Sequence, residues 1–235
     1  MKKILMIASL ILIFYAGNRV AAAVIYVDSS RNAGLNNGTS WSDAFLSLQS
    51  ALNIAVSGDE IWVAKGTYKP SYDYGLGGGS RYFHFRMKND VAIYGGFAGT
   101  ETAVSQRTDV RAGEVNETIL SGDLNGDDVI TGAGATLSIS NNSENCYHVF
   151  YHPSGSGLNT TAILDGFSIT GGNANGSDPN RDGGGMLNNT ASVSLNNLYI
   201  YGNSASYTGG GICNINSAPV IIGCSIRKNC SLAAG

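Results

Sequence analysis

The sequence predicts an all-β protein built as a parallel β-helix, a solenoid in which each turn of the chain stacks on the one before. Two observations predict this fold class. A Gly-Gly-Gly-apolar string occurs at 183–186 and again at 209–212, 26 residues later, and self-similarity at a period of about 20–50 residues is the mark of a repeat architecture. Between the glycine runs, short apolar alternations are separated by Gly, Asn, Ser and Thr, which is typical of short strands joined by tight turns.

The strands are predicted from three segments that align when the repeats are placed in register: 163–174, 194–205 and 221–231. In each segment apolar and polar residues alternate, which is the period of a strand and not of a helix. A strand this short cannot bury its apolar side alone, so stacking like residues above like would form the core and pair the strands in parallel. The equivalent core positions are expected at Phe167, Leu198 and Cys224, and at Ile169, Ile200 and Ile226.

The glycine runs and several asparagines are predicted to be structural elements of the repeat. Glycine allows a positive φ at a corner and leaves no side chain to contact the coil above. Stacked Asn side chains can bond to one another and to the turn backbone. The residues assigned to this role are Gly183, Gly184, Gly185, Gly209, Gly210 and Gly211, with the asparagine pairs Asn188 and Asn214, and Asn203 and Asn229.

The N-terminal part is predicted to cap the solenoid. Apolar residues recur at helical spacing within 40–59, with Ser40 and Asp43 as a start signal and Gly58 as a stop signal. Such a helix would cover the open end of the coil, as repeat proteins require. At one turn per 26 residues, the 175 residues from Ile61 onward predict about seven turns and a rod of roughly 33 Å. Segment 70–80 is expected to be an exposed loop.

The first 23 residues are predicted to be a secretory signal peptide. Lys2 and Lys3 precede a short apolar run, and Ala21–Ala23 supply the small residues of a cleavage site. The predicted organisation is therefore a signal peptide at 1–23, a strand and capping helix at 24–60, and a β-helix at 61–235. The sequence stops inside a repeat, so further C-terminal coils are expected to be missing. We expect an exported protein, secreted or held at the cell surface or outer membrane.

The composition excludes some classes of partner. Charged residues make up 13% of the chain, the net charge is −3, and Lys and Arg do not cluster, so a nucleic-acid interface is not expected. We expect a monomeric solenoid. Four cysteines in an exported protein allow disulfides, but Cys224 aligns with the core position of Leu198, which favours buried thiols. Cys213 with Cys230 is the one bridge that merits a test.

The strings ALNIAVSGDEIWVAKGTY, GGGICN and LYIYGNSA resemble the right-handed parallel β-helix proteins of the pectin-lyase-like superfamily. Within that group the chain is similar to bacterial surface proteins that carry polymorphic outer-membrane-type Gly-Gly-Ile and Asn repeats. The resemblance covers about 40–70 and 160–235 well, and it implies a right-handed coil and a role at the cell surface. The chain departs from the pattern at Leu198 and Ile200, which stand where the family has an aromatic residue before Asn203.

Calcium is the one cofactor that the sequence suggests. In GDLNGDD (122–128), Asp123, Asn125 and Asp127 stand at alternate positions, as at the start of a Ca²⁺-binding loop. The twelfth position holds Gly134 and not an acidic residue, and a plain turn explains the same sequence, so both interpretations stay open.

Further binding candidates lie on a protruding loop and on one strand. The insertion 173–182, which lengthens its coil from 26 to 31 residues, carries Asp178, Arg181 and Asp182, and loops that protrude from a regular scaffold often bind ligands. Tyr199 and Tyr201 could stack on sugar rings. His148 and His152 are predicted to share one face of a strand and to be structural, because two histidines without a third ligand rarely form a metal site.

No catalytic residue is predicted. A lyase or hydrolase on this fold would gather carboxylates or a base on one face at the repeat interval, but Asp165 is followed in register by Asn196 and then Ile222. We therefore expect a non-catalytic exported scaffold that binds polysaccharide or another cell-surface ligand. The alternative is a polysaccharide lyase or glycoside hydrolase whose active coils lie beyond residue 235.

Overall fold

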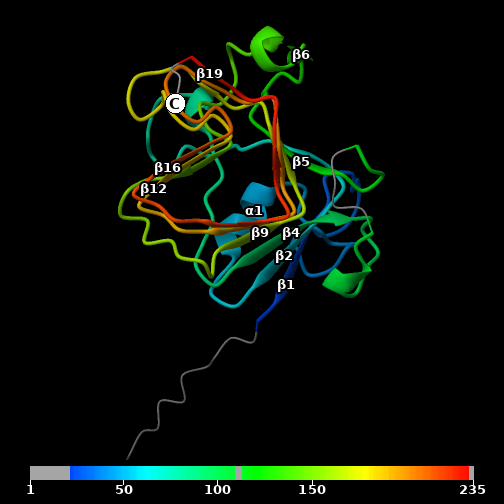
Figure 1. Ribbon diagram of the computed structural model, residues 1–235. Helices are drawn as coiled ribbons and strands as arrows, with labels where there is room; N and C mark the ends of the chain where they lie inside the picture. The colour runs from blue at the N-terminus through cyan, green and yellow to red at the C-terminus, as the bar shows by residue number, and fades with distance from the viewer. Residues whose placement is uncertain (1–21, 109–112, 233–235) are drawn as a thin grey trace, which may run out of the picture.

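The chain folds as a right-handed parallel β-helix, with one short helix at its N-terminal end (Figure 1). The computed structural model describes residues 22–108 and 113–232; most of the predicted signal peptide lies outside these ranges. Within them, the largest sheet has six strands, all parallel, in the order β1-β2-β4-β9-β13-β17. These strands are β1 (Val24–Val27), β2 (Glu60–Ala64), β4 (Ala92–Phe97), β9 (Ile163–Asp165), β13 (Ser194–Asn196) and β17 (Val220–Ile222).

Three further parallel sheets complete the walls of the solenoid in the described residues. One contains β3 (Gly66–Tyr68), β5 (Thr118–Ser121), β10 (Ser168–Thr170), β14 (Tyr199–Ile200) and β18 (Ser225–Ile226). Another contains β8 (Phe150–His152), β12 (Met186–Asn189) and β16 (Ile212–Ile215), and the last contains β11 (Asn173–Ala174), β15 (Ser204–Ala205) and β19 (Cys230–Ser231).

The strand register agrees with the alignment of the repeats. Ile169 pairs with Ile200, and Ile200 pairs with Ile226. Asp165 pairs with Asn196, and Asn196 pairs with Ile222. Acidic residues therefore do not stack above one another at this position of the described coils. Each of these pairs joins one coil to the next in parallel.

The prediction of about seven evenly spaced turns is wrong. Glu60 pairs with Ala92, Ala92 with Ile163, Ile163 with Ser194 and Ser194 with Val220, so successive coils take 32, 71, 31 and 26 residues. The 71-residue coil is long because loops leave the wall and return. Its largest excursion carries an antiparallel hairpin of β6 (Val129–Thr131) and β7 (Ser138–Ser140), which projects from the coils beside the label β6 in Figure 1.

Three 3₁₀ turns, all in connecting segments, complete the secondary structure of the described residues: Ser80–Tyr82, Val104–Gln106 and Gly134–Thr136.

The helix is shorter than predicted and begins later. α1 spans Leu48–Ile54, with Ser47 as its N-cap, and not the region from Ser40. Phe45 is taken out of the helix because it pairs with β1: its N–H donates to Tyr26 O at 2.9 Å, and its carbonyl accepts from the Asp28 N–H at 2.8 Å. A backbone that exchanges these bonds with a strand cannot also make helical ones.

α1 covers the interior of the first coils. Leu48, Ala51 and Leu52 are buried in the same core cluster as Ile61 and Ile93. Figure 1 looks along the solenoid, and α1 lies within the outline of the coils. The helix therefore acts as the predicted cap over this end of the core.

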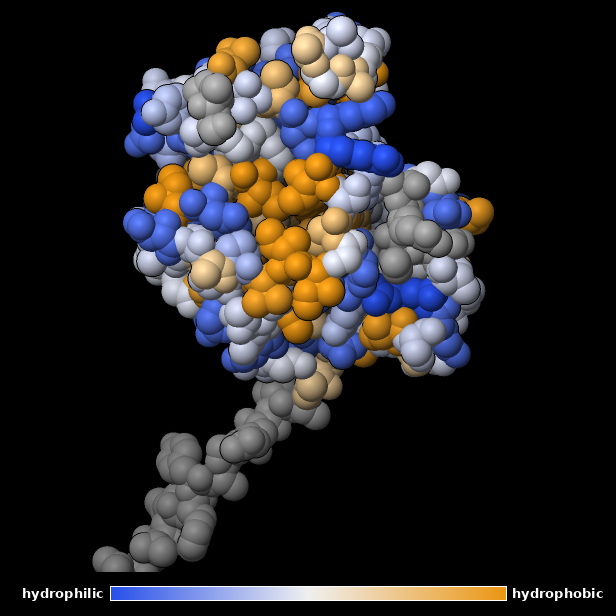
Figure 2. Space-filling model, viewed as in Figure 1, coloured by the Kyte–Doolittle hydropathy of each residue, from blue (hydrophilic) through white to orange (hydrophobic). Residues whose placement is uncertain are grey.

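The opposite end of the solenoid exposes apolar side chains. Val220, Ile221, Ile222 and Ile226 on β17 and β18 are each more than 40% exposed, and Figure 2 shows apolar surface in the middle of this face. No helix in the described residues is long and apolar enough to cross a membrane.

Close coil-to-coil contact explains the glycine runs. A Cβ on Gly185 would lie 2.4 Å from Gly211 O, and one on Gly184 would lie 2.2 Å from Ser204 O. Both distances are too short for any side chain, so only glycine permits this stacking. Gly183 and Gly209 open the two runs with φ of 69° and 63°, the left-handed geometry that glycine adopts without strain.

Candidate functional site

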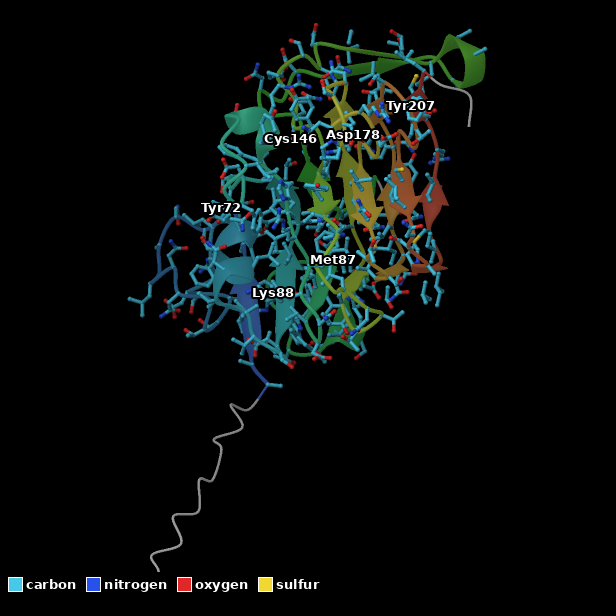
Figure 3. All side chains as sticks on the ribbon, turned by 90° about the vertical axis from the view of Figure 1, so that its left-hand side faces the viewer. Tyr72, Met87, Lys88, Cys146, Asp178 and Tyr207 are labelled. Carbon is cyan, nitrogen blue, oxygen red and sulfur yellow. The ribbon has the colours of Figure 1, made fainter. Side chains whose placement is uncertain are left out.

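The described part of the chain has a cleft of about 660 Å³ beside α1, near the N-terminal end of the solenoid. Figure 3 shows Tyr72, Met87 and Lys88 on this side of the molecule, toward the end where the chain begins. The cleft is open to solvent and is formed by the helix, by the loop after β3, by 86–88 and by the residues at and after the end of β8. Its lining residues are Leu52, Asn53, Tyr72, Tyr74, Arg86, Met87, Lys88, His152, Ser156 and Leu158.

A row of aromatic rings runs from this cleft, which Tyr72 and Tyr74 line, into the interior of the protein. Tyr72 lies against Tyr74 with ring centroids 4.8 Å apart, and Tyr74 stacks on His84 at 4.8 Å. His84 contacts Tyr151 at 5.3 Å, and Tyr151 contacts His148 at 5.1 Å. Tyr72, at the outer end, is 49% exposed, whereas Tyr151, His84 and His148 are buried. Tyr72 is therefore the ring of this row that is most open to solvent, and the buried rings lie behind it.

Two cationic side chains lie beside the rings. The Arg86 guanidinium lies 4.1 Å from the centre of the Tyr74 ring, and its Nε donates to His84 Nε2 at 2.9 Å. Lys88 Nζ donates to the carbonyl of Ala55, the residue that ends α1, at 2.8 Å. Among the residues that the structure describes, neither side chain forms an ion pair.

The electrostatics of the cleft favour an anion. Burial lowers the pKa of Arg86, and it also lowers the pKa of Lys88, where Asp59 offsets part of the effect. Both shifts mean that the charged form has lost solvation without full compensation. The cleft is lined by these two cations and by no carboxylate. A bound anion would supply the missing compensation.

The histidines of this region are neutral and serve as hydrogen-bond partners. Burial lowers the pKa of His152 to about 4 and that of His84 to about 3. His152 Nε2 accepts from the Met87 N–H at 3.2 Å, which assigns the proton to Nδ1, and Nδ1 donates to Asn188 Oδ1 at 2.7 Å. Asn188 Nδ2 donates in turn to Asn214 Oδ1 at 2.9 Å. This chain of bonds fixes the floor of the cleft.

A second group of polar residues lies at the base of the β6–β7 hairpin. Carboxylate oxygens of Asp123, Asp127 and Glu144 all lie within 4.8 Å of one another. Asp123 is buried and organises its own loop, since its carboxylate accepts from the Gly126 N–H at 2.5 Å and from the Asp128 N–H at 3.1 Å. Oxygen ligands of this kind suit a hard divalent cation.

Asp128 and Asn145 extend this acidic group. Asn145 Nδ2 donates to Asp128 Oδ2 at 2.8 Å. Burial, together with the charges of Asp123, Glu144 and Asp127, raises the pKa of Asp128 to about 6, against the opposing effect of the Asn145 hydrogen bond. Asp128 Oδ1, Glu144 Oε1 and Asn145 Oδ1 are all buried without a hydrogen-bond partner.

The predicted calcium loop is only partly brought together. Asp123 and Asp127 meet, but their third partner is Glu144, which lies far along the chain, before β8. Asn125 is exposed and lies outside the group. The alternating motif in the sequence predicted the loop at 123–127 but not Glu144. Glu144 is brought to the loop by the β6–β7 hairpin, whose sequence is not part of the repeats.

The other predicted binding residues lie away from the cleft. Arg181 Nε is 3.5 Å from Asp182 and 3.7 Å from Asp178, and its guanidinium lies 4.5 Å from the centre of the Tyr207 ring. Asp182 Oδ1 also accepts from the Thr208 N–H at 2.9 Å. These charges therefore have partners within the chain. Figure 3 shows Asp178 and Tyr207 near the upper rim, apart from Tyr72 and Lys88.

Tyr199 and Tyr201 lie on a different wall from the cleft. Tyr199 is in β14, within the sheet that also contains β10 and β18, and its ring is 4.8 Å from that of Tyr201. The Arg227 guanidinium lies 4.6 Å from the Tyr199 ring. Arg227 thus lies over Tyr199 as Arg86 lies over Tyr74, but neither Arg227 nor Tyr199 lines the cleft.

The cleft itself was not predicted from the sequence. Segment 70–80 was expected to be an exposed loop, and it supplies Tyr72 and Tyr74. A signal was present in RYFHFRMK (81–88), where His84, Arg86 and Lys88 alternate with apolar residues. Alternation places such side chains on one face, but this stretch lies outside the clear repeats.

Comparisons with known proteins add one likeness of fold. No family model matches the chain. No curated protein matches it. Among solved structures, the crystal structure of pectate lyase Pel9A is similar, with a TM-score of 0.40 and 15% sequence identity over 87% of this chain and 47% of that chain. The chain thus spans about half the length of that protein.

Proposed function

We propose that this protein is an exported, non-catalytic β-helix that binds an acidic polysaccharide in the cleft beside α1. The observation that carries the proposal is the pair of partly buried cations, Arg86 and Lys88, that have no ion-pair partner in the described chain and stand beside an exposed tyrosine. Fold alone does not assign a function, so the proposal depends on this site.

The cations would bind the acidic groups of the polymer. Arg86 uses Nε on His84, and no hydrogen bond from its two terminal nitrogens occurs within the described residues. A guanidinium with free terminal N–H groups can bind a carboxylate through two parallel bonds. Lys88 adds a second point charge. Arg86 could therefore bind one uronate carboxylate or sulfate group of the polymer while Lys88 binds a second such group.

The tyrosines would bind the sugar rings. Tyr72 is 49% exposed. The ring of Tyr74, in contrast, is covered by the Arg86 guanidinium and stacks on His84. Tyr72 is thus the free platform, and an aromatic ring can pack against the apolar face of a sugar while its hydroxyl stays in water. Asn53 and Ser156 line the cleft and offer polar groups to sugar hydroxyls.

Export completes the proposal. The signal-like N-terminus, with Lys2, Lys3 and Ala21–Ala23 around an apolar run, supports secretion or display at the cell surface. There an acidic polymer of a matrix or of another cell is an accessible ligand, and adhesion to it is the proposed biological role. We expect a monomeric solenoid to be sufficient for this role.

Calorimetric titration tests the binding. The probes are polygalacturonate oligomers and the same oligomers as methyl esters, which keep the rings and lose the charge. We expect the free acid to bind, the ester to bind about tenfold or more weakly, and added salt to weaken only the acid, because exposed charges are screened. Equal binding of acid and ester would contradict the proposal.

Matched variants locate the ligand. Arg86→Gln and Tyr72→Ala are expected to weaken binding of the acid about tenfold or more. Arg227→Gln is the control, because it removes an arginine that also lies over a tyrosine, but on another wall. Unsaturated products or new reducing ends in the same mixtures would overturn the non-catalytic assignment.

A further inference from the structure

The base of the β6–β7 hairpin holds an unbalanced concentration of negative charge. Asp123, Asp127 and Glu144 converge, and Asp128, the residue after Asp127, adds a fourth carboxyl that accepts a hydrogen bond from Asn145. In the described chain no Lys or Arg forms an ion pair with any of them. Lys69 approaches the loop, but its Nζ donates to the carbonyl of Leu124 at 3.0 Å.

The chain passes through this base twice, once on the way into the hairpin and once on the way out. The outgoing strand β5 is followed by Asp123–Asp128, and Glu144 and Asn145 precede β8. Beyond the β6–β7 ladder, the two passages are joined by the Cys146 N–H, which donates to Gly122 O at 2.9 Å. They are also joined by Asn141 Nδ2, which donates to Asp127 O at 3.1 Å, and by Asn145 Nδ2, which donates to Asp128 Oδ2 at 2.8 Å. The carboxylates of the two passages repel one another, and a cation between them would offset this repulsion.

Asn145 provides an independent indication of a ligand. Its side chain is 1% exposed, its Nδ2 is bonded to Asp128 of the acidic group, and its Oδ1 has no partner. A buried amide oxygen without a donor is costly, as are the buried Asp128 Oδ1 and Glu144 Oε1. All three atoms are oxygens, and each can coordinate a hard metal ion.

We propose that Ca²⁺ binds at the base of the hairpin, between the carboxylates of Asp123, Asp127, Asp128 and Glu144 and the amide oxygen of Asn145. The donor set contains oxygen alone, without a histidine or cysteine, which selects against zinc and copper. Several carboxylates with an amide oxygen suit the six to eight ligands that Ca²⁺ accepts in flexible geometry, whereas Mg²⁺ requires a stricter octahedron and keeps its waters.

The ion would clamp the two passages of the longest coil. It would neutralise the repulsion between Asp128, at the entry to β6, and Glu144, on the return from β7. The hairpin would then be held against the wall, and the unpartnered oxygens would be satisfied. This inference is independent of the proposed polysaccharide binding, because none of these residues lines the cleft.

The test uses the full mature chain after removal of divalent ions with a chelator. Direct titration with CaCl₂ and with MgCl₂ measures binding, and thermal unfolding with and without each ion measures the effect on stability. We expect one Ca²⁺ per chain, a higher melting temperature with Ca²⁺ and a smaller effect of Mg²⁺. No binding of Ca²⁺ to the intact protein would overturn the proposal.

Variants assign the ligands. Glu144→Gln and Asp128→Asn are expected to weaken Ca²⁺ binding about tenfold or more, whereas Asp178→Asn, an exposed acid in another loop, should leave it unchanged. Without metal, Asp128→Asn should melt no lower than the unchanged chain, because it removes like-charge repulsion. Retention of full Ca²⁺ affinity by both site variants would contradict the assignment.

Proteolysis gives a second measurement that does not depend on variant folding. In the unchanged chain, Ca²⁺ should slow cleavage within 123–145 and leave cleavage in the loop 173–182 unaffected. Equal protection of both loops, or of neither, would contradict a clamp at the hairpin.

Discussion

At the scale of single residues, neutral buried histidines mark where the structure is sensitive to acid. All three histidines of the chain, His84, His148 and His152, have a pKa that burial lowers. Because burial lowers the pKa of His152 to about 4 and that of His84 to about 3, the folded protein keeps these two histidines unprotonated near neutral pH, whereas the unfolded chain binds protons below about pH 6.5. The stability contributed by these neutral histidines is therefore fully present above pH 6.5. The free energy of unfolding decreases as the pH falls from 6.5 toward 4, because protons bind preferentially to the unfolded chain.

His152→Gln tests this contribution. Between pH 6 and pH 5 the free energy of unfolding of the unchanged chain should fall more steeply than that of the variant, by up to about 1.4 kcal/mol per pH unit. Asp128 acts with the opposite sign in this range, because its pKa is raised, and the comparison with the variant cancels its effect. Urea denaturation at several pH values measures the difference. Parallel slopes would show that His152 is not buried and neutral.

The asparagine column is the second residue-scale feature. Asn203 is fully buried; its Oδ1 accepts from the Gly172 N–H at 2.9 Å, and its Nδ2 donates to Asn229 Oδ1 and to Ile169 O, both at 3.0 Å. These bonds join three successive coils.

Asn203→Ala should lower the free energy of unfolding by about 2–4 kcal/mol, because it leaves several buried polar groups without partners. Asn214→Ala, at an exposed position of the other column, should cost less, about 1 kcal/mol or under, since water can replace the lost bonds. Denaturant unfolding compares the two. A smaller loss at Asn203 than at Asn214 would contradict the column's role.

At the scale of elements, α1 depends on one capping side chain. The Ser47 hydroxyl accepts from the Ser50 N–H at 3.2 Å. Ser47→Ala should cost about 1 kcal/mol of stability, and Ser47→Asp should restore most of it, because an aspartate also accepts at this position. Denaturant unfolding measures both. A helix capped from Ser40 would instead make Ser40→Ala the more harmful change.

How far the elements could be predicted depends on whether they repeat. The strands from Ile163 to Ser231 could be placed from the sequence, because like residues recur at 26- or 31-residue intervals and pair as expected. The helix start could not, because Phe45 pairs with β1, a contact that no local pattern shows.

The same reason limits prediction of both sites. Tyr72 and Arg86 lie in the irregular coil between β2 and β4, and Glu144 meets Asp123 only because a long hairpin returns to its base. Both groups are therefore tertiary arrangements of loops. The sequence could suggest Asp123 and Asp127 from a local motif, but residues joined only by folding require the structure.

At the scale of the whole molecule, the solenoid separates three surfaces. The cleft lies by the helix-capped end, the acidic group lies at the base of a projecting hairpin, and the apolar last coil faces the other way. The chain carries a net charge of −3, so attraction of an acidic polymer must come from the local cations and not from the overall charge.

A crystal structure of the chain with a bound polygalacturonate oligomer tests the central claim most directly. We predict one ligand carboxylate within hydrogen-bonding distance of the Arg86 guanidinium and a sugar ring packed on Tyr72. An oligomer bound on another wall, such as beside Tyr199 and Arg227, or an empty cleft at a concentration that saturates binding in solution, would contradict the account.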